Sequence, residues 1–174
     1  MIPTKKWLQL LDADKEEDRL NITEELLDSE NNEFIKNIRE QVDHALAVIA
    51  VEAQQEADVY WNANRTAQEE GLTNEQCRIG TRVRIIGVSL VAEWYRNRFF
   101  KNDPKQKKKS ILSTHIKKGR SNKYSMSHFK KEPNWAQDLI KQIEDRYVIL
   151  RQRNAALTKI RRAIREYERL LNKK

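Results

Sequence analysis

Two long stretches of the chain carry apolar residues at the spacing of an amphipathic helix. In the first, which fades before Gly71, aliphatic residues recur every seven positions at Ile35, Val42 and Ile49. In the second, which opens at Pro133, the seven-residue repeat comprises Ile143, Leu150, Leu157, Ile164 and Leu171. The spacing predicts one helix over residues 32–69 and another over 132–174 that packs along a helical partner. That partner is either the first helix of the same chain, in an antiparallel pair, or the same helix of a second chain.

The stretch between these helices alternates apolar and polar residues, which is the pattern of β-strands. Residues 78–100 form one alternating run that Gly87 is expected to bend, and a helix over 88–100 is an alternative. Two further strands are predicted at 110–118 and 123–130. Three successive strands with short connections predict an antiparallel meander.

The predicted fold class is therefore α+β, mostly α, with two long helices packed as a coiled-coil-like pair and a three-stranded antiparallel β-meander. We divide the chain into an acidic helical region (1–72), a basic meander (73–131) and the C-terminal heptad helix (132–174). Within the first region, Thr23 followed by two glutamates is a suitable helix start.

The composition argues against several classes of function. Four glycines among 174 residues are too few for the usual glycine-rich phosphate loops. The single cysteine, Cys77, excludes a disulfide framework and is expected to be a small buried thiol. His115 and His128 fall on neighbouring predicted strands, but two histidines without a positioned carboxylate make a poor metal site. We expect no cofactor, no metal ion and no enzymatic activity.

The sequence also bears on localisation. It contains no run of 18 or more apolar residues, so no membrane-spanning segment is predicted. The N-terminus lacks the basic, apolar and small-residue layout of a signal peptide. We therefore expect a cytoplasmic protein that does not engage a membrane.

Charge is divided unequally along the chain. The formal net charge is +8, but residues 1–77 hold seven basic and 18 acidic residues, whereas residues 78–174 hold 27 basic and eight acidic ones. The excess peaks over residues 96–131, where 13 basic residues stand against the single acid Asp103. Such a cluster of cations indicates a polyanionic partner. Three interpretations are open for the acidic half: it binds a basic protein, it covers the basic half until DNA displaces it, or, as we favour, it is simply a solvated face.

The basic region is expected to bind double-stranded DNA. A twisted sheet fits the major groove, with alternate side chains directed at bases and loop lysines at phosphates. Arginines suit base recognition because their forked donors match the O6 and N7 atoms of guanine. The candidate DNA-binding residues are Arg96, Asn97, Arg98, Lys101, Lys107, Lys108, Lys109, Lys117, Lys118, Arg120, Asn122 and Lys123.

Other interpretations of the same residues remain open. Lysines at sheet edges also protect against aggregation, and the chain would then be a coiled-coil protein–protein adaptor without nucleic-acid binding. Aromatic residues of this region would stack bases in an RNA- or single-strand-binding protein, although such residues more often form a core. They are Trp94, Tyr95, Phe99, Phe100, Tyr124, Phe129 and Trp135. A second basic face is interpreted as the solvated side of the last helix: Arg151, Arg162, Arg165, Arg169 and Lys173.

Three short segments and the helix that follows them resemble a known family. They are Trp94-Tyr95-Arg96-Asn97-Arg98-Phe99, His115-Ile116-Lys117-Lys118-Gly119-Arg120 and Tyr124, followed by the basic heptad helix. Together they resemble the MobI-type conjugative-transfer proteins of integrative conjugative elements and large conjugative plasmids, over roughly residues 90–170.

This resemblance implies a bacterial accessory factor in the initiation of conjugative transfer. Such a factor acts at the origin of transfer, in the relaxosome, beside the relaxase that nicks the DNA, and has no nicking activity of its own. The expected partners are double-stranded DNA of the origin of transfer, a relaxase or another transfer-initiation protein, and a second copy of the chain in a homodimer.

Overall fold

The structure, a computed structural model, describes residues 2–70, 77–99 and 111–173. Three short helical segments, α1 (Thr4–Gln9), η1 (Ala13–Lys15) and α2 (Glu16–Leu20), precede the long helix α3 (Glu24–Glu69). They are followed by the strands β1 (Ile79–Ile86), β2 (Ser89–Phe99) and β3 (Ile111–His115), the 3₁₀ turn η2 (Met126–Phe129) and the helix α4 (Asn134–Leu171). The predicted fold class, mostly helical with a three-stranded antiparallel sheet, is confirmed. None of the helices described is long and apolar enough to cross a membrane.

The chain divides into two compact units, and both long helices contribute to each. Unit 1 comprises Met1–His44 and Lys159–Lys174, and unit 2 comprises Ala45–Thr158. All three strands belong to unit 2, together with the large hydrophobic core. The candidate site described below therefore lies within unit 2.

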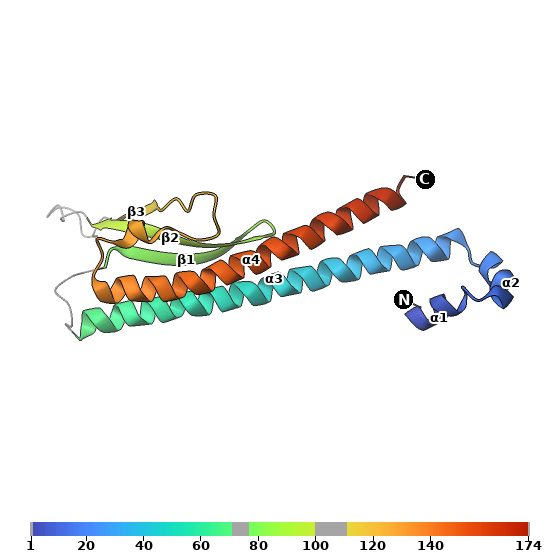
Figure 1. Ribbon diagram of the computed structural model, residues 1–174, viewed down its shortest axis with the longest axis horizontal. Coiled ribbons are helices and arrows are strands. Elements are labelled where there is room, and N and C mark those ends of the chain that lie inside the picture. The colour runs from blue at the N-terminus through green and yellow to red at the C-terminus, as the bar shows by residue number, and fades with distance from the viewer. Residues whose placement is uncertain (1, 71–76, 100–110, 174) are drawn as a thin grey trace, which may run out of the picture. The chain divides into compact units, whose positions relative to one another are not determined.

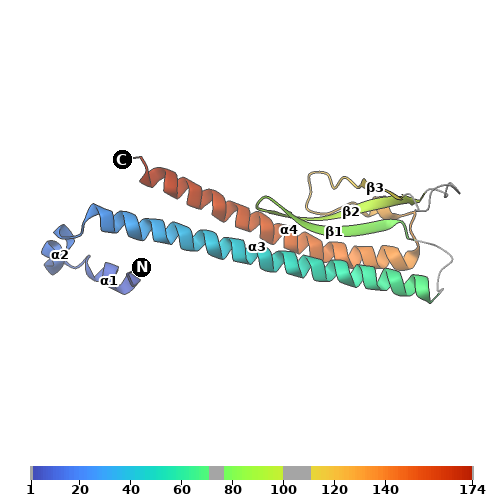
Figure 2. The same cartoon turned by 180° about the vertical axis from the view of Figure 1, so that it is seen from behind.

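Helices α3 and α4 pack together as an antiparallel pair within one chain, as Figures 1 and 2 show. The first of the two partners that the sequence left open is thus the one observed. The predicted seven-residue repeats form the seam: Ile35, Val42 and Ile49 of α3 and Ile143, Leu150 and Ile164 of α4 are all buried. Burial of these aliphatic side chains removes apolar surface from water and is what holds the two helices together.

Ion pairs between α3 and α4 flank this seam. In unit 1 they are Arg39–Glu168 at 2.5 Å and Arg161–Asp43 at 2.7 Å. In unit 2 they are Arg153–Glu52 at 2.5 Å and Arg146–Glu56 at 3.5 Å. Three acids of the N-terminal half, Asp43, Glu52 and Glu56, are therefore engaged with the last helix.

Helix α3 begins earlier than the predicted start at residue 32. It starts at Glu24, because the Thr23 hydroxyl accepts a hydrogen bond from the Leu26 amide at 3.2 Å and so caps the first turn. The helix start that Thr23 indicates and the long helical pattern thus belong to one continuous helix.

The sheet is an antiparallel meander in the order β1-β2-β3. Strands β1 and β2 pair from Ile79 opposite Arg96 to Ile86 opposite Ser89. Gly87, with a φ of 59°, occupies the first position of the two-residue turn that joins them, where glycine adopts left-handed backbone without strain. Strand β3 pairs only with the last part of β2, over residues 95–99.

The strands are not the segments predicted from the alternating pattern. Residues 78–100 are neither one bent strand nor a helix over 88–100, because the run folds back at Gly87 to give both β1 and β2. The segment 123–130, predicted as the third strand, contains the 3₁₀ turn η2 instead. There the Ser125 hydroxyl accepts a hydrogen bond from the Ser127 amide at 3.3 Å, which caps a turn rather than a strand.

One face of the sheet packs on the helices around Trp94 of β2. The Trp94 ring centroid lies 5.3 Å from that of Tyr60 on α3, 5.7 Å from Tyr147 on α4 and 5.8 Å from Phe129 of η2. Cys77 is buried beside Tyr60, and burial raises the pKa of its thiol. The interpretation of Cys77 as a small buried thiol is thus confirmed.

Beyond the reach of β3, side chains of α4 take up polar groups along the free edge of β2. The Leu90 amide donates to Asn154 Oδ1 at 3.2 Å. The Ala92 carbonyl accepts from Arg151 Nη2 at 2.8 Å. Arg151 is therefore buried between sheet and helix and does not belong to the solvated face on which the sequence placed it.

The same arginine is held by Glu144, a carboxylate with 0% exposure. Glu144 pairs with Arg151 at 2.8 Å and also accepts hydrogen bonds from Trp94 Nε1 and from the Tyr124 amide, each at 2.8 Å. A buried charge requires a partner and further hydrogen bonds, and Glu144 has both. This network fixes β2, α4 and the segment before η2 to one another.

Candidate nucleic-acid interface

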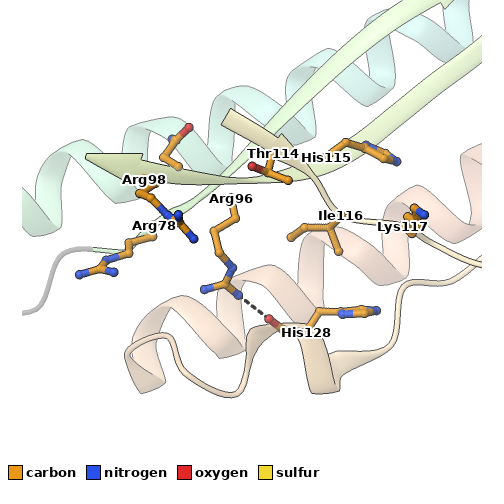
Figure 3. Close-up of a pocket in the computed structure, with 9 residues that line it drawn as sticks. Arg78, Arg96, Arg98, Thr114, His115, Ile116, Lys117 and His128 are labelled. Atoms are coloured by element: carbon orange, nitrogen blue, oxygen red, sulfur yellow. Dashed lines mark hydrogen bonds between the residues drawn. The ribbon is translucent and has the colours of Figure 1, made fainter. Parts of the chain in front are cut away.

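A basic groove lies where β2 and β3 run together beside η2. Its volume is about 420 Å³, and its lining contains no carboxylate. Figure 3 shows the side chains that surround it, which come from the start of β1, from β2, from β3 and its continuation, and from η2. They are Arg78, Arg96, Asn97, Arg98, Thr114, His115, Ile116, Lys117 and His128. We call this site the basic groove.

Alternation along β2 places two of the arginines together. Arg96 and Arg98 are two residues apart and so point to the same face of the sheet, and Thr114 of β3 lies directly opposite Arg96. This is the face that carries Trp94, so both arginines lie on the helix-facing side, just past the end of the core. Asn97 points to the opposite face, where Ser113 donates a hydrogen bond to its Oδ1 at 2.7 Å.

Arg96 is the anchored cation of the groove. Its guanidinium pairs with Glu132 at 2.7 Å and donates to the His128 carbonyl at 2.6 Å, the contact drawn in Figure 3. The Glu132 side chain is only 3% exposed, and its other oxygen accepts from the Arg78 amide at 2.9 Å. Arg96 therefore joins the sheet to the turn before α4. Its charge is already paired with a carboxylate of the protein itself.

Three other cations of the groove are uncommitted. The side chains of Arg78, Arg98 and Lys117 make no hydrogen bond or ion pair with any residue that the structure describes. Three like charges around one hollow attract an anion, because each added negative charge relieves their mutual repulsion. The guanidinium forks and the ammonium group match the oxygens of a phosphate.

Four of the predicted residues belong to the lining of this groove, namely Arg96, Asn97, Arg98 and Lys117, but the side chain of Asn97 points to the other face of the sheet. Four others lie on the segment between β3 and η2 and do not line it. Predicted positions Lys101, Lys107, Lys108 and Lys109 fall outside the described residues.

The four on the segment after β3 have different surroundings. Lys118 donates to the Ser121 carbonyl, and burial, with Arg151 nearby, lowers its pKa. Lys123 pairs with Asp145 at 2.5 Å. The Asn122 backbone carbonyl accepts from Arg151 at 2.7 Å. Arg120 is exposed and has no partner among the residues described.

Sequence reasoning missed Arg78 as a member of the groove. Arg78 directly precedes β1, and its carbonyl accepts a hydrogen bond from the Asn97 amide at 2.7 Å, which brings it beside the β2 arginines. Once β1 and β2 are recognised as a hairpin closed at Gly87, the register places residue 78 opposite residue 97. The hairpin turn was therefore the signal that would have found it.

The two predicted histidines both belong to the lining of the groove, although they do not lie on neighbouring strands. His115 ends β3 and His128 belongs to η2 rather than to a neighbouring strand, yet both line the groove. Within the described part of the chain, no group of three or more His, Cys, Asp or Glu residues could hold a metal ion. The groove is thus an array of cations and hydrogen-bond donors.

Comparison with known proteins gives one match. The family model described as MobI protein matches residues 49–165 of the 174-residue chain, a range that contains the whole basic groove. No curated protein matches the chain, and no solved structure matches it.

Proposed function

Because the chain belongs to the MobI family of conjugative mobilization accessory proteins, we propose that it binds double-stranded DNA at an origin of transfer and helps the relaxase to assemble there. The binding site in this proposal is the basic groove, together with Arg120 on the segment after β3. The predicted loop lysines 101 and 107–109 would add contacts to the DNA backbone.

The observation that carries the proposal is a set of three cations, Arg78, Arg98 and Lys117, whose side chains pair with none of the described residues and surround a hollow without a carboxylate in its lining. Duplex DNA presents one negative charge for about every 1.7 Å of its axis, so clustered cations meet several phosphates at once. Basic side chains beside the seam of the helix pair form ion pairs with acidic side chains, as Arg39, Arg146 and Arg153 do here. The side chains of Arg78, Arg98 and Lys117 pair with no acidic side chain among the described residues.

Duplex DNA is favoured over single strands because of where the aromatic rings lie. Trp94, Tyr124 and Phe129 are buried in the core, with exposures of 0%, 3% and 0%. Rings that stack on single-stranded bases must be open to solvent. Burial of these three rings weakens the alternative of an RNA- or single-strand-binding protein, whereas Phe99 of β2 stays 40% exposed. Competition between duplex, single-stranded DNA and RNA tests this alternative directly.

The test of the groove is a triple variant, Arg78→Ala, Arg98→Ala and Lys117→Ala. Arg96 is left in place because its loss would leave the buried Glu132 carboxylate without its counter-charge. A loss of DNA binding could then not be distinguished from a loss of stability. We expect retardation of a duplex carrying the origin of transfer to be lost at physiological salt. The slope of log affinity against log salt should fall by about one for each phosphate contact removed.

A matched control removes the same charge elsewhere. Lys159, Arg162 and Arg165 are exposed on α4 and have no partner in the part of the chain that is described. Their triple alanine variant should keep most of the affinity and the same helicity by circular dichroism. Equal losses in both variants would mean that total charge alone attracts DNA, and unchanged binding in the groove variant would reject the groove.

The relaxase step of the proposal needs its own experiment. Footprinting of the origin duplex with this protein, with relaxase, and with both should show an extended or strengthened footprint for the pair. Independent footprints of unchanged strength would restrict the protein to DNA binding without assembly.

The homodimer remains a prediction, and its basis has changed. The heptad repeat of α4 is covered by α3 of the same chain, so a coiled coil between chains is no longer needed to bury it. Val48, Val51 and Val59 of α3 remain exposed and offer apolar area for a second copy. Light scattering with and without DNA measures the oligomeric state. If the chain forms a complex with another protein but never with DNA, the adaptor alternative is favoured.

A further inference from the structure

A second basic cluster lies on the face of the sheet opposite Trp94. Arg82 and Arg84 of β1 point to this face, as does Glu93 of β2, which is the direct partner of Arg82. Glu93 Oε1 accepts from both Arg82 Nε and Arg84 Nη2. The Glu93 side chain is 8% exposed while each arginine side chain is 44% exposed. The carboxylate thus lies beneath two guanidinium groups that face solvent.

The contacts hold these guanidinium groups in place. Glu93 Oε2 also contacts His115 Nδ1 at 3.1 Å, so both carboxylate oxygens are used. The Arg82 guanidinium carbon lies 5.4 Å from the centroid of the Tyr95 ring. That ring covers Gly80 so closely that a Cβ there would collide with it, which fixes the ring against the strand. Arginines oriented in this way lose less side-chain freedom when they bind a ligand.

The local architecture is a two-stranded ribbon. Strand β3 pairs with β2 only over residues 95–99. At the level of Arg82 and Arg84, therefore, the sheet that the structure describes consists of β1 and β2 alone. A two-stranded antiparallel ribbon is one of the two elements that the DNA major groove admits. Residues two apart on a strand are separated by about 6.8 Å, which equals two base-pair steps of about 3.4 Å.

We propose that Arg82 and Arg84 recognise two guanines about two base pairs apart in the major groove, and that Glu93 acts as their positioning residue. The inference rests on the proposed function, which it deepens by separating two tasks. The basic groove holds phosphates and the β1–β2 ribbon reads base edges. Arginine forks are suited to the O6 and N7 acceptors of guanine.

Charge favours bases over phosphates as the target of this ribbon. The Glu93 carboxylate offsets one of the two arginine charges and would repel a phosphate placed above it. A base edge carries no net charge, so the carboxylate can orient the donors without that penalty. The basic groove, in contrast, has no carboxylate in its lining.

The test exchanges both arginines for lysine, as Arg82→Lys with Arg84→Lys. Lysine keeps the charge but lacks the fork that makes two bonds to one guanine. Selection of binding sites from a random duplex library should return two guanine positions for the native protein and should lose both for the variant. Discrimination against other bases should drop on the order of tenfold to a hundredfold per position, while affinity for random duplex and its salt slope stay unchanged.

A second variant, Glu93→Gln, removes negative charge without removing a donor. If Glu93 only weakens phosphate binding, all sequences should bind more tightly and preference should persist. Under the proposal, preference for guanine falls even though affinity for random duplex rises or holds. Arg162→Lys on α4 is the control and should change neither quantity.

The outcomes separate this inference from the proposed function. A native protein that binds no duplex overturns both. A protein that binds duplex through the basic groove but keeps its guanine positions in the lysine variant, or has none to begin with, overturns the ribbon alone. Thermal unfolding of each variant, with a midpoint close to native, confirms that the loss is one of recognition.

Discussion

Arg96 and Arg151 each end on a buried carboxylate. Arg96 pairs with Glu132, and Arg151 pairs with the fully buried Glu144. Charge runs predicted that this half of the chain carries an excess of cations, and Arg98 is exposed as that prediction requires. The same runs could not show which arginines meet a buried partner, because that depends on how the sheet docks on α4. At the scale of single residues, the sequence predicts where cations cluster but not which of them form ion pairs within the protein.

The Glu144–Arg151 pair gives a prediction about single residues. Glu144→Gln leaves the Arg151 guanidinium buried without a counter-charge, and we expect the free energy of unfolding to fall by about 3–5 kcal/mol. Urea titration followed by circular dichroism measures this. Adding Arg151→Met should recover part of the loss, since the pair is then removed together.

The control for this pair lies on the surface. Glu166 and Arg169 form an exposed pair one turn apart on α4. Glu166→Gln should leave the unfolding midpoint unchanged, because exposed pairs contribute little. A Glu144→Gln protein as stable as the native one would mean that the buried network does not hold the sheet to the helix.

At the scale of elements, periodicity predicted the helices better than the strands. The heptad repeat predicted both ends of α4 to within three residues, because five matched positions fit a helix and do not fit the two-residue period of a strand. The turn at Gly87 was missed since Val88, the second turn residue, is a strand-former and the alternation continues past it. The alternating residues 123–130 resemble a strand, but Ser125 caps the turn η2 there. Local side-chain hydrogen bonds decided what the pattern alone could not.

The seam between α3 and α4 gives a prediction about elements. The hydrogen bond from Arg153 lowers the pKa of Glu52, so this pair stabilises the folded state above the ordinary glutamate pKa of about 4.3. Its contribution is lost as the pH falls through the lowered pKa of the folded state. Glu52→Arg should cost about 0.2–1 kcal/mol at neutral pH, the range for exposed pairs, plus repulsion from Arg153.

The charge-swapped variant provides the control. Glu52→Arg combined with Arg153→Glu restores opposite charges across the seam and should return the thermal midpoint close to the native value. At a pH well below 4 the penalty of Glu52→Arg should shrink to the repulsion between the two arginines, because the native ion pair is then lost. A Glu52→Arg penalty of constant size across that range would show that packing, and not the charge pair, is responsible.

At the scale of the whole molecule, the fold class could be predicted from the sequence, but the position of the hydrophobic core along the helix pair could not. The hydrophobic cluster draws on α3, α4, the sheet and η2, all within unit 2. In unit 1 the buried apolar side chains described are Ile35, Val42 and Ile164. The seven-residue repeat runs through both units without change, so periodicity could not indicate that one end of the pair packs on a sheet and the other does not.

This difference predicts uneven stability along continuous helices. Amide hydrogen exchange should be slowest around Tyr60 and Trp94 in unit 2 and at least about tenfold faster around Ile35 and Ile164 in unit 1. Ala53→Gly in α3 should speed exchange throughout unit 2. Uniform protection along the whole of α3 would instead show that both units open together.

The side chains that α4 extends to the rim of β2 also bear on how copies of the protein meet. Strands with bare backbone groups invite strands from other molecules, and such pairing leads to fibres. Asn154 and Arg151 already occupy the Leu90 amide and the Ala92 carbonyl. A foreign strand would have to displace a buried arginine from Glu144 before it could add here. That rim of the sheet is therefore closed to β-type aggregation even where many copies of the protein gather.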